Sequence, residues 1–169
     1  CAAFDYDITI VAKSTDDDAI GLGYIDPAVA EKVALEHTGT VLVTRALEES
    51  HGHLLCVTDD DVSVRAARRD AEIASRCLCP VYLLSVASNE EGRPAAEQAI
   101  AAARREIESV GVRPSGEIVV VGDPVERIVE EGRKYSVIVL SPISSQSRWR
   151  RLFSRTTTIN VLKRAHNSV

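Results

Sequence analysis

The stretch Val119–Leu140, VVVGDPVERIVEEGRKYSVIVL, contains the pattern that decides the fold. It begins and ends with unbroken apolar runs without polar alternation, as expected for parallel strands that are covered on both faces. Between these runs, Asp123, Pro124 and Glu126 predict an N-cap, a proline at the first helical position and a capping-box glutamate. Gly132 can end that helix. The stretch therefore predicts one strand–helix–strand unit of a parallel sheet.

The same alternation of apolar runs and amphipathic segments continues in both directions along the chain. The predicted strands are Asp7–Ala12, Thr40–Thr44, His53–Val57, Val81–Val86, Glu117–Val121 and Ser136–Leu140. Strands that alternate with helices form right-handed crossovers. The sequence therefore predicts an α/β fold with an open, mainly parallel sheet and helices on both faces.

Four more helices are predicted from their apolar stripes and end signals. One starts at Asp26–Pro27 and stops at Gly39, and another covers about Thr156–Ala165. A helix that begins at Asp60 or Asp61 should run to about Cys77, with these residues facing inward: Ala66, Ile73, Ala74 and Cys77. The remaining helix has Pro94 in its first turn, Gly111 as its stop and an apolar stripe of Ala96, Ile100, Ala103, Ile107 and Val110.

Composition and charge exclude some classes of protein. The chain has 169 residues, of which 45% are apolar, and a net charge of -5. This balance argues against a general nucleic-acid binder, whose footprint is usually basic. No apolar stretch approaches the roughly 18 residues that span a bilayer. The four cysteines, Cys1, Cys56, Cys77 and Cys79, are expected to be buried, reduced thiols of a cytoplasmic protein rather than a disulfide framework.

An internal repeat is visible at the two ends of the chain. YDITIVA at Tyr6 is similar to YSVIVLS at Tyr135, 129 residues later, and HTGTVLV at His37 matches AHNSV at Ala165 with an offset of 128. We therefore expect residues 1–46 to be the last strand–helix–strand of a first unit, and residues 53–169 to be a second unit that lacks its last strand. Because the chain contains no methionine and begins with Cys1, we expect it to be a piece of a longer protein.

Four stretches of the second unit follow one another in a characteristic order: LLCVTDDDVSVRAARRDAEIA, VYLLSV, VVVGDPVERIVEEGRKYSVIVL and RRLFSRTTTINVLKRA. In these stretches the second unit resembles the universal stress protein family over about Leu54–Val169, and the first unit resembles that family's C-terminal third over Asp7–Thr44. The resemblance implies a Rossmann-like parallel sheet of five strands, and dimers or tandem pseudo-dimers that associate through their last strands. In one branch of the family it implies ATP at the C-terminal ends of the strands.

The loop that follows Leu140 departs from the ATP-binding branch. That branch carries Gly-x2-Gly-x9-Gly-(Ser/Thr) after its fourth strand; here Ser141, Ser144 and Ser154 stand at the glycine positions, and Arg155 replaces the last hydroxyl residue. A backbone that wraps phosphate often needs positive φ, and a residue other than glycine costs roughly 1–2 kcal/mol at each such position. We therefore expect that the ATP-binding loop is lost.

The first unit departs further from that motif. Ala12 and Thr15 hold its first two glycine positions, and Asp26–Pro27 holds the last pair. The carboxylates of Asp16, Asp17 and Asp18 would repel an anion.

Three interpretations of the loop's basic segment remain open. Arg148, Trp149, Arg150, Arg151 and Arg155 can bind an anion or nucleotide, because arginine binds phosphate without glycine and Arg155 starts the last helix. They can instead form a basic surface turn, with Trp149 packed on its own domain or on a neighbour. They can also contact a membrane surface or an acidic partner.

The resemblance also implies a degenerate nucleotide site elsewhere. It places Asp59 at the family's acidic residue beside base and ribose, and Val86 where the backbone meets adenine. Together with Gly122, Ser141, Ser144, Ser154 and Arg155 they make up the candidate site. Asp59 has an alternative role as a helix cap, while Asp60 and Asp61 replace a small Gly-Ser pair and add negative charge.

Other chemistry-bearing residues give weaker signals. His51 and His53 lack further ligands at metal spacing, so no metal is expected. Cys77 and Cys79 indicate core packing rather than a redox motif. The sequence shows no nucleophile–base–orienter set, so we expect no enzyme. A slow nucleotide hydrolase would need metal-binding and water-activating groups that cannot be assigned in the sequence.

These observations predict a cytoplasmic regulatory or assembly domain that binds no cofactor. The resemblance implies that such a domain is the C-terminal tail of a membrane transporter, of the amino-acid permease or cation antiporter type, in contact with its own membrane domain. The alternative is a free-standing tandem universal stress protein that senses ATP, AMP or a cyclic nucleotide. Because a bare sheet edge beside Ser136–Leu140 is an aggregation risk, we also predict that Thr40–Thr44 pairs near this edge or across a homodimer.

Overall fold

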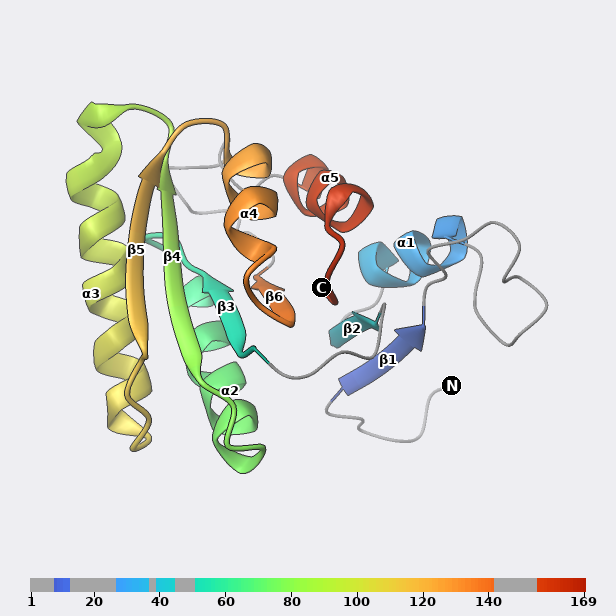
Figure 1. The fold of residues 1–169 in the computed structure, drawn as a ribbon, viewed down its shortest axis with the longest axis horizontal. Helices are drawn as coiled ribbons and strands as arrows, with labels where there is room; N and C mark the ends of the chain where they lie inside the picture. Colours follow the sequence, from blue (N-terminus) through green and yellow to red (C-terminus); the bar gives the residue numbers. More distant parts are fainter. Residues whose placement is uncertain (1–7, 13–26, 37–38, 45–50, 142–154) are drawn as a thin grey trace.

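The computed structural model describes residues 8–12, 27–36, 39–44, 51–141 and 155–169, which form alternating strands and helices (Figure 1). Each strand agrees with its predicted range to within one residue at either end. The elements are β1 (Ile8–Ala12), α1 (Pro27–Glu36), β2 (Thr40–Thr44), β3 (His53–Cys56), α2 (Asp61–Arg76), β4 (Val81–Ala87), η2 (Glu90–Gly92), α3 (Arg93–Ser109), β5 (Gly116–Val121), α4 (Pro124–Gly132), β6 (Val137–Leu140) and α5 (Arg155–Arg164).

The strands form two parallel sheets. The larger one has the order β5-β4-β3-β6, and the smaller one pairs β1 with β2. In the larger sheet Leu54 of β3 lies between Tyr82 of β4 and Ile138 of β6. This arrangement confirms the predicted α/β fold with a parallel sheet.

Helices cover both faces of the larger sheet, and each face has its own core. Alternate residues of β3 point to opposite sides: Leu54 packs towards α4 and α5, whereas Leu55 packs towards α2 and α3. Both side chains are almost completely buried. This double burial explains why the strands are unbroken apolar runs.

Two of the predicted N-caps are present in the described residues, and the choice between Asp60 and Asp61 is settled. Asp60 caps α2, because its carboxylate accepts hydrogen bonds from the backbone N–H groups of Val62 and Ser63. Asp123 caps α4 and accepts from the N–H of Glu126. These caps satisfy backbone donors that the first turn of each helix leaves free.

The inward face of α2 differs from the predicted one. Of the predicted residues only Ala74 is buried; the buried stripe consists of Ser63, Ala67, Ala71 and Ala74. Small side chains let the helix lie close to the sheet and to α3, so α2 turns this stripe inward rather than its larger residues. Cys77 is exposed because the helix ends at Arg76 and Leu78 turns the chain outward with a φ of 56°.

The expectation of buried thiols is therefore correct for Cys56 and wrong for Cys77. Burial raises the pKa of the Cys56 thiol, which stays protonated and unreactive. Cys79 is partly buried and Cys1 lies outside the described residues.

The two segments that are similar in sequence also have the same order of elements. β1 pairs with β2 through Ile8 and Thr40, and β6 pairs with the C-terminal end of the chain through Val137 and Ser168. The helices between them, α1 and α5, both have 10 residues. The offset in sequence therefore corresponds to an equivalent position in each strand–helix–strand unit.

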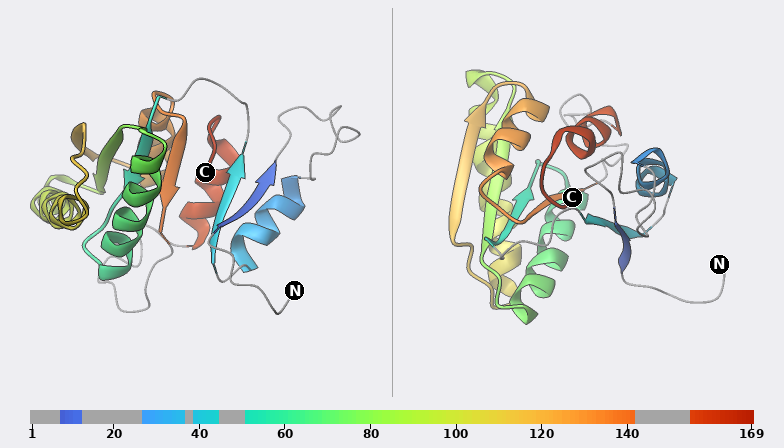
Figure 2. Two further views of the ribbon diagram at one scale, coloured as in Figure 1. Left: turned by 90° about the horizontal axis from the view of Figure 1, so that it is seen from below. Right: turned by 45° about the vertical axis from the view of Figure 1, so that its right-hand side comes forward.

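The two units meet where β2 pairs with the C-terminal residue of the chain (Figure 2). The N–H of Val43 donates to the carbonyl of Val169 at 2.7 Å, and the N–H of Val169 donates back to Val43 at 3.0 Å. Such a reciprocal pair is typical of antiparallel strands. The predicted pairing of Thr40–Thr44 beside the edge of the second unit is thus present within the chain.

The junction of the two units also has a core of its own. Val11, Ala30 and Val43 of the first unit are buried together with Leu162 of α5. An ion pair of 3.3 Å between Glu31 and Lys163 connects α1 to α5.

None of the helices in the part of the chain that the structure describes is long and apolar enough to cross a membrane.

Candidate functional site

Four of the predicted site residues lie at one edge of the larger sheet. Asp59 follows β3, Val86 lies at the end of β4, Gly122 follows β5 and Ser141 follows β6. All four strands are parallel, so their carboxyl ends meet at this edge. Ligands of open α/β sheets bind at such an edge.

Asp59 and Val86 share a small hollow at the ends of β3 and β4. It is lined by Thr58, Asp59, Ser85, Val86, Ala87, Gly92, Ala95, Ala96 and Ala99. Its volume is about 20 Å³. That is room for about one water molecule, whereas small-molecule sites usually have about 300 Å³ or more.

The hollow is small because α3 lies close against the end of β4. The helix turns alanines towards it, and Ala96 and Ala99 are themselves buried. Side chains of one carbon allow the helix backbone to approach the strand closely.

Two polar residues of this hollow were not among the predicted site residues. The hydroxyl of Ser85 donates to the carbonyl of Val57 at 2.9 Å, and the hydroxyl of Thr58 donates to Asp60 at 2.7 Å. The signal for Ser85 was available, since it is the one polar residue after Tyr82 in the apolar run VYLLSVA. Both hydroxyls are used to hold the turn that positions Asp59.

The three consecutive aspartates have different roles. Asp60 is 8% exposed, and its carboxylate is satisfied by two backbone N–H groups and by Thr58. Asp59 is exposed and is not the cap. It is therefore the carboxylate at the hollow that a solute can reach. Asp61 is also exposed but lies in the first turn of α2, where its charge favours the helix.

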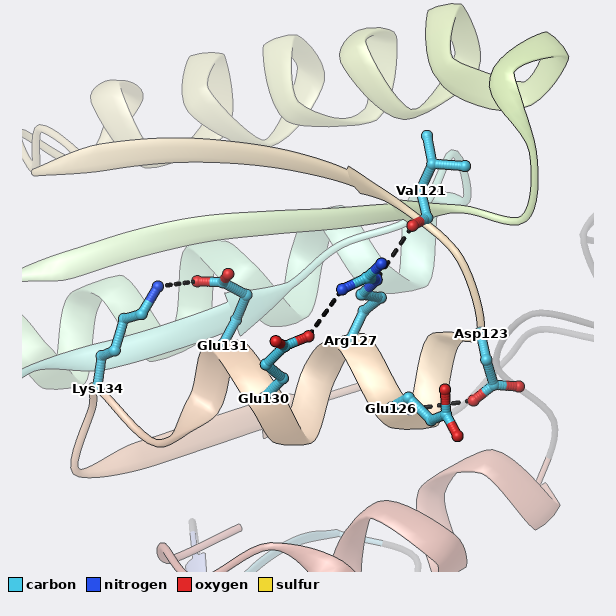
Figure 3. A network of polar contacts seen from close by, with 7 residues as sticks. All are labelled: Val121, Asp123, Glu126, Arg127, Glu130, Glu131 and Lys134. Carbon is cyan, nitrogen blue, oxygen red and sulfur yellow. Dashed lines mark hydrogen bonds and ion pairs between the residues drawn. The ribbon is translucent and has the colours of Figure 1, made fainter.

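Gly122 is held by its own chain. Its N–H donates to the carbonyl of Ala87 at 2.9 Å, and its φ of 143° belongs to a region that glycine tolerates. The side chain of Arg127 lies close to Gly122. Its Nε donates to the carbonyl of Val121 at 3.1 Å, and its Nη1 donates to Glu130 at 2.8 Å (Figure 3). The backbone N–H of Gly122 is therefore already paired within the protein.

The basic loop lies largely outside the described residues. Ser141 is buried at the end of β6. Arg155 begins α5, as predicted for the start of the last helix, but its side chain lies outside the description. The remaining predicted residues of the loop are also outside it: Ser144, Arg148, Trp149, Arg150, Arg151 and Ser154.

The first unit's counterpart of the loop is described only at its ends. Ala12 ends β1 and Pro27 begins α1. Thr15, the aspartates at 16–18 and Asp26 lie outside the described residues.

The histidines lie at the opposite edge of the sheet. His53 begins β3, and its Nδ1 lies 3.0 Å from a carboxylate oxygen of Asp70 on α2. The backbone N–H of His51 donates to Ser136. Within the described residues no three His, Cys, Asp or Glu side chains gather as a metal site would need.

Comparisons with solved structures identify the fold. A universal stress protein in complex with cAMP superimposes with a TM-score of 0.56 at 20% identity, over 71% of this chain and 94% of that one. A universal stress protein from Archaeoglobus fulgidus superimposes with a TM-score of 0.56 at 22% identity, over 69% and 93%. The chain has the universal stress protein fold.

A third universal stress structure extends over both units. A putative universal stress protein from Pseudomonas aeruginosa superimposes with a TM-score of 0.68 at 16% identity, over 96% of this chain and 62% of that one. No protein-family model and no curated protein matches the chain. The similarity of this chain to universal stress proteins is therefore a similarity of fold.

Proposed function

We propose that this chain is a regulatory or assembly domain of the universal stress type that has lost the ATP-binding loop. The small hollow between Asp59 and Val86 carries this proposal, because its volume of about 20 Å³ is far below the 300 Å³ or more that is typical of small-molecule sites. Two further features support it. The N–H of Gly122 is paired with Ala87, and serines stand at the three glycine positions of the loop.

The two units, in this proposal, act as a pseudo-dimer within one chain. The reciprocal hydrogen bonds between Val43 and Val169, and the shared core around Leu162, support this arrangement. A superposition over 96% of the chain on one longer universal stress protein supports it as well. A homodimer formed through the same strands would need Val43 to exchange Val169 of its own chain for that of a partner.

The domain is further proposed to work in the cytoplasm as the tail of a membrane transporter, of the amino-acid permease or cation antiporter type. The departure from glycine in both loops supports this, because a domain that does not bind ATP acts through contacts with other protein segments. The complete reading frame tests it: about a dozen apolar spans of some 20 residues are expected upstream of the first repeat. A frame that encodes universal stress units alone would contradict it.

A nucleotide sensor is the second candidate. Asp59 is exposed in the same hollow as Val86, and two of the similar structures hold cAMP and dAMP. If α3 moved away from β4, this hollow would widen at the position where the resemblance puts the base.

A thermal-shift titration with ATP, AMP and cAMP separates the two candidates. A ligand at 100 times its dissociation constant stabilises a protein by about 2.7 kcal/mol, which a melting curve detects easily. For a domain that has lost the site we expect no shift at millimolar nucleotide. A shift that disappears in Asp59→Ala and Arg155→Ala but persists in the control Asp61→Ala would establish the sensor instead.

A further inference from the structure

The turn that connects α2 to β4 carries two thiols. Cys77 follows the last residue of α2 and is exposed, whereas Cys79 lies just before β4 and is partly buried. Figure 1 shows this turn at the end of α2, on the outside of the molecule. The third described cysteine, Cys56, is buried in the core. Because disulfide exchange requires access to a thiol, Cys77 is the described thiol that a solute reaches most readily.

The turn holds these two cysteines close together. The backbone N–H groups of Cys77 and Cys79 both donate to the carbonyl of Ala74, at 3.1 Å and 2.9 Å, so the chain reverses direction here. The thiol of Cys79 donates to the carbonyl oxygen of Cys77 at 3.7 Å. A disulfide needs Cα atoms about 4.4–6.8 Å apart, and two residues of even an extended chain span only about 7 Å. A bond between Cys77 and Cys79 therefore requires only a local change in this turn.

The residue between the two thiols has a strained backbone. Leu78 has a φ of 56° and is the only residue other than glycine with a positive φ in the described part of the chain. Its N–H donates to Ser75 while that of Cys79 donates to Ala74, which is the Schellman pattern, and glycine usually occupies the position of Leu78 in that motif. The Leu78 side chain is 92% exposed, so its own packing does not offset the strain. Strain of this kind is common at functional sites.

We propose that Cys77 and Cys79 form a thiol–disulfide switch that reacts with an anionic disulfide of low molecular weight, such as oxidised glutathione. The thiolate of Cys77 attacks one sulfur of that disulfide, so that a mixed disulfide forms and one small thiolate leaves. The thiolate of Cys79 then attacks Sγ of Cys77, which closes the bond between the two cysteines and releases the second small thiolate. The protein loses two electrons to the small disulfide, and the two thiol protons pass through solvent to the departing thiolates.

The surroundings of the turn suit this reaction. Arg76 ends α2 beside Cys77 and is exposed, so its charge attracts the carboxylates of such a disulfide. In the cytoplasm, where the domain is proposed to work, a disulfide is usually transient, as a switch requires. The turn precedes β4, whereas the hollow with Val86 lies at the other end of that strand. The inference therefore goes beyond the proposed function and does not depend on whether a nucleotide binds.

Reaction of the folded chain with oxidised glutathione tests the proposal. The parent for this experiment is Cys1→Ser, because Cys1 is the one thiol outside the described residues. We expect an intact mass about 2 Da below that of the reduced chain, from the loss of two hydrogens, and peptide mapping should find Cys77 bonded to Cys79. Excess dithiothreitol should restore the starting mass. A chain that stays unmodified, or one that keeps glutathione on Cys77, would overturn the proposal.

Single substitutions in the same parent assign the two steps. Cys79→Ser should keep one glutathione on Cys77, because no second thiol displaces it. Cys77→Ser should react at least about tenfold more slowly than the parent, because Cys79 is partly buried. The matched control is Cys56→Ala, which should form the bond at the parent rate, since Cys56 is buried away from solutes. Reaction of Cys77→Ser at the parent rate would contradict the role of Cys77 as the attacking thiol.

Discussion

The strand–helix–strand unit at residues 8–44 and its counterpart at residues 137–169 have the same pairing but different surroundings. Ile8 pairs with Thr40 in one unit, and Val137 pairs with Ser168 in the other. Yet Ile10 is exposed where Val139 packs into a core, and Val29 is exposed where Thr157 is buried. Local sequence therefore gives both units the same strands and helix, while the neighbouring elements determine which side chains are buried. Substitutions at equivalent positions should separate these two contributions.

The largest effect is expected where the two units share a core. Leu162 is 3% exposed and packs with Val11, Ala30 and Val43. Leu162→Ala should therefore cost about 2–5 kcal/mol of the free energy of unfolding, from lost burial and the cavity left behind. Urea denaturation followed by circular dichroism measures this cost. A loss below about 1 kcal/mol would mean that the units do not share a core.

Removal of Val169 tests the strand pairing between the units. The truncated chain loses both hydrogen bonds to Val43, each of which contributes about 0.5–1.5 kcal/mol, and the apolar contacts of the side chain. We expect a loss of about 2–3 kcal/mol in the same assay. Val169→Ala is the control, because it keeps the two backbone bonds and should lose roughly half as much. Equal losses in the two variants would show that the backbone pairing contributes little.

Val161 and Val33 provide a matched pair at equivalent positions of α5 and α1. Val161 is completely buried, whereas Val33 is only partly buried. Val161→Ala should cost about 2 kcal/mol and Val33→Ala about 1 kcal/mol or less, because the second site has already kept contact with water. Equal costs at the two positions would contradict this difference in burial.

The smallest effect is expected for the ion pair between α1 and α5. The Lys163 side chain is 54% exposed and its Nζ lies 3.3 Å from Glu31. Lys163→Ala should change the free energy of unfolding by less than about 1 kcal/mol, since water and salt screen such a pair. Denaturation at low and high salt checks this: the difference between variant and parent should shrink as salt rises. A loss comparable to that of Leu162→Ala would contradict it.

Much of the fold could be predicted because its signals are local. Unbroken apolar runs predicted each strand, and Asp123 with Pro124 predicted the start of α4, since capping depends on residues within one turn. The inward face of α2 could not be predicted in the same way. Ala67 and Ala71 are buried because the sheet and α3 lie close to them, whereas hydrophobicity alone favours Ile73.

The candidate site could likewise be predicted from the sequence only in part. The positions of Asp59, Val86, Gly122 and Ser141 at one sheet edge follow from the order of the strands, which the sequence shows. The choice of Asp60 as the cap, with Asp59 exposed, required the geometry of the turn after β3. The size of the hollow required the distance between α3 and β4, which no local pattern contains.

The sequence by itself determined the alternation of strands and helices, the helix caps, the repeat and the departure of the loop from glycine. These depend on backbone preferences and on periodicity over a few residues. Only the tertiary structure decided that Val43 pairs with Val169 of its own chain, that the hollow beside Asp59 is small and that Ile10 is exposed. The physical reason is that hydrogen bonding between strands and burial of side chains depend on which distant elements come into contact.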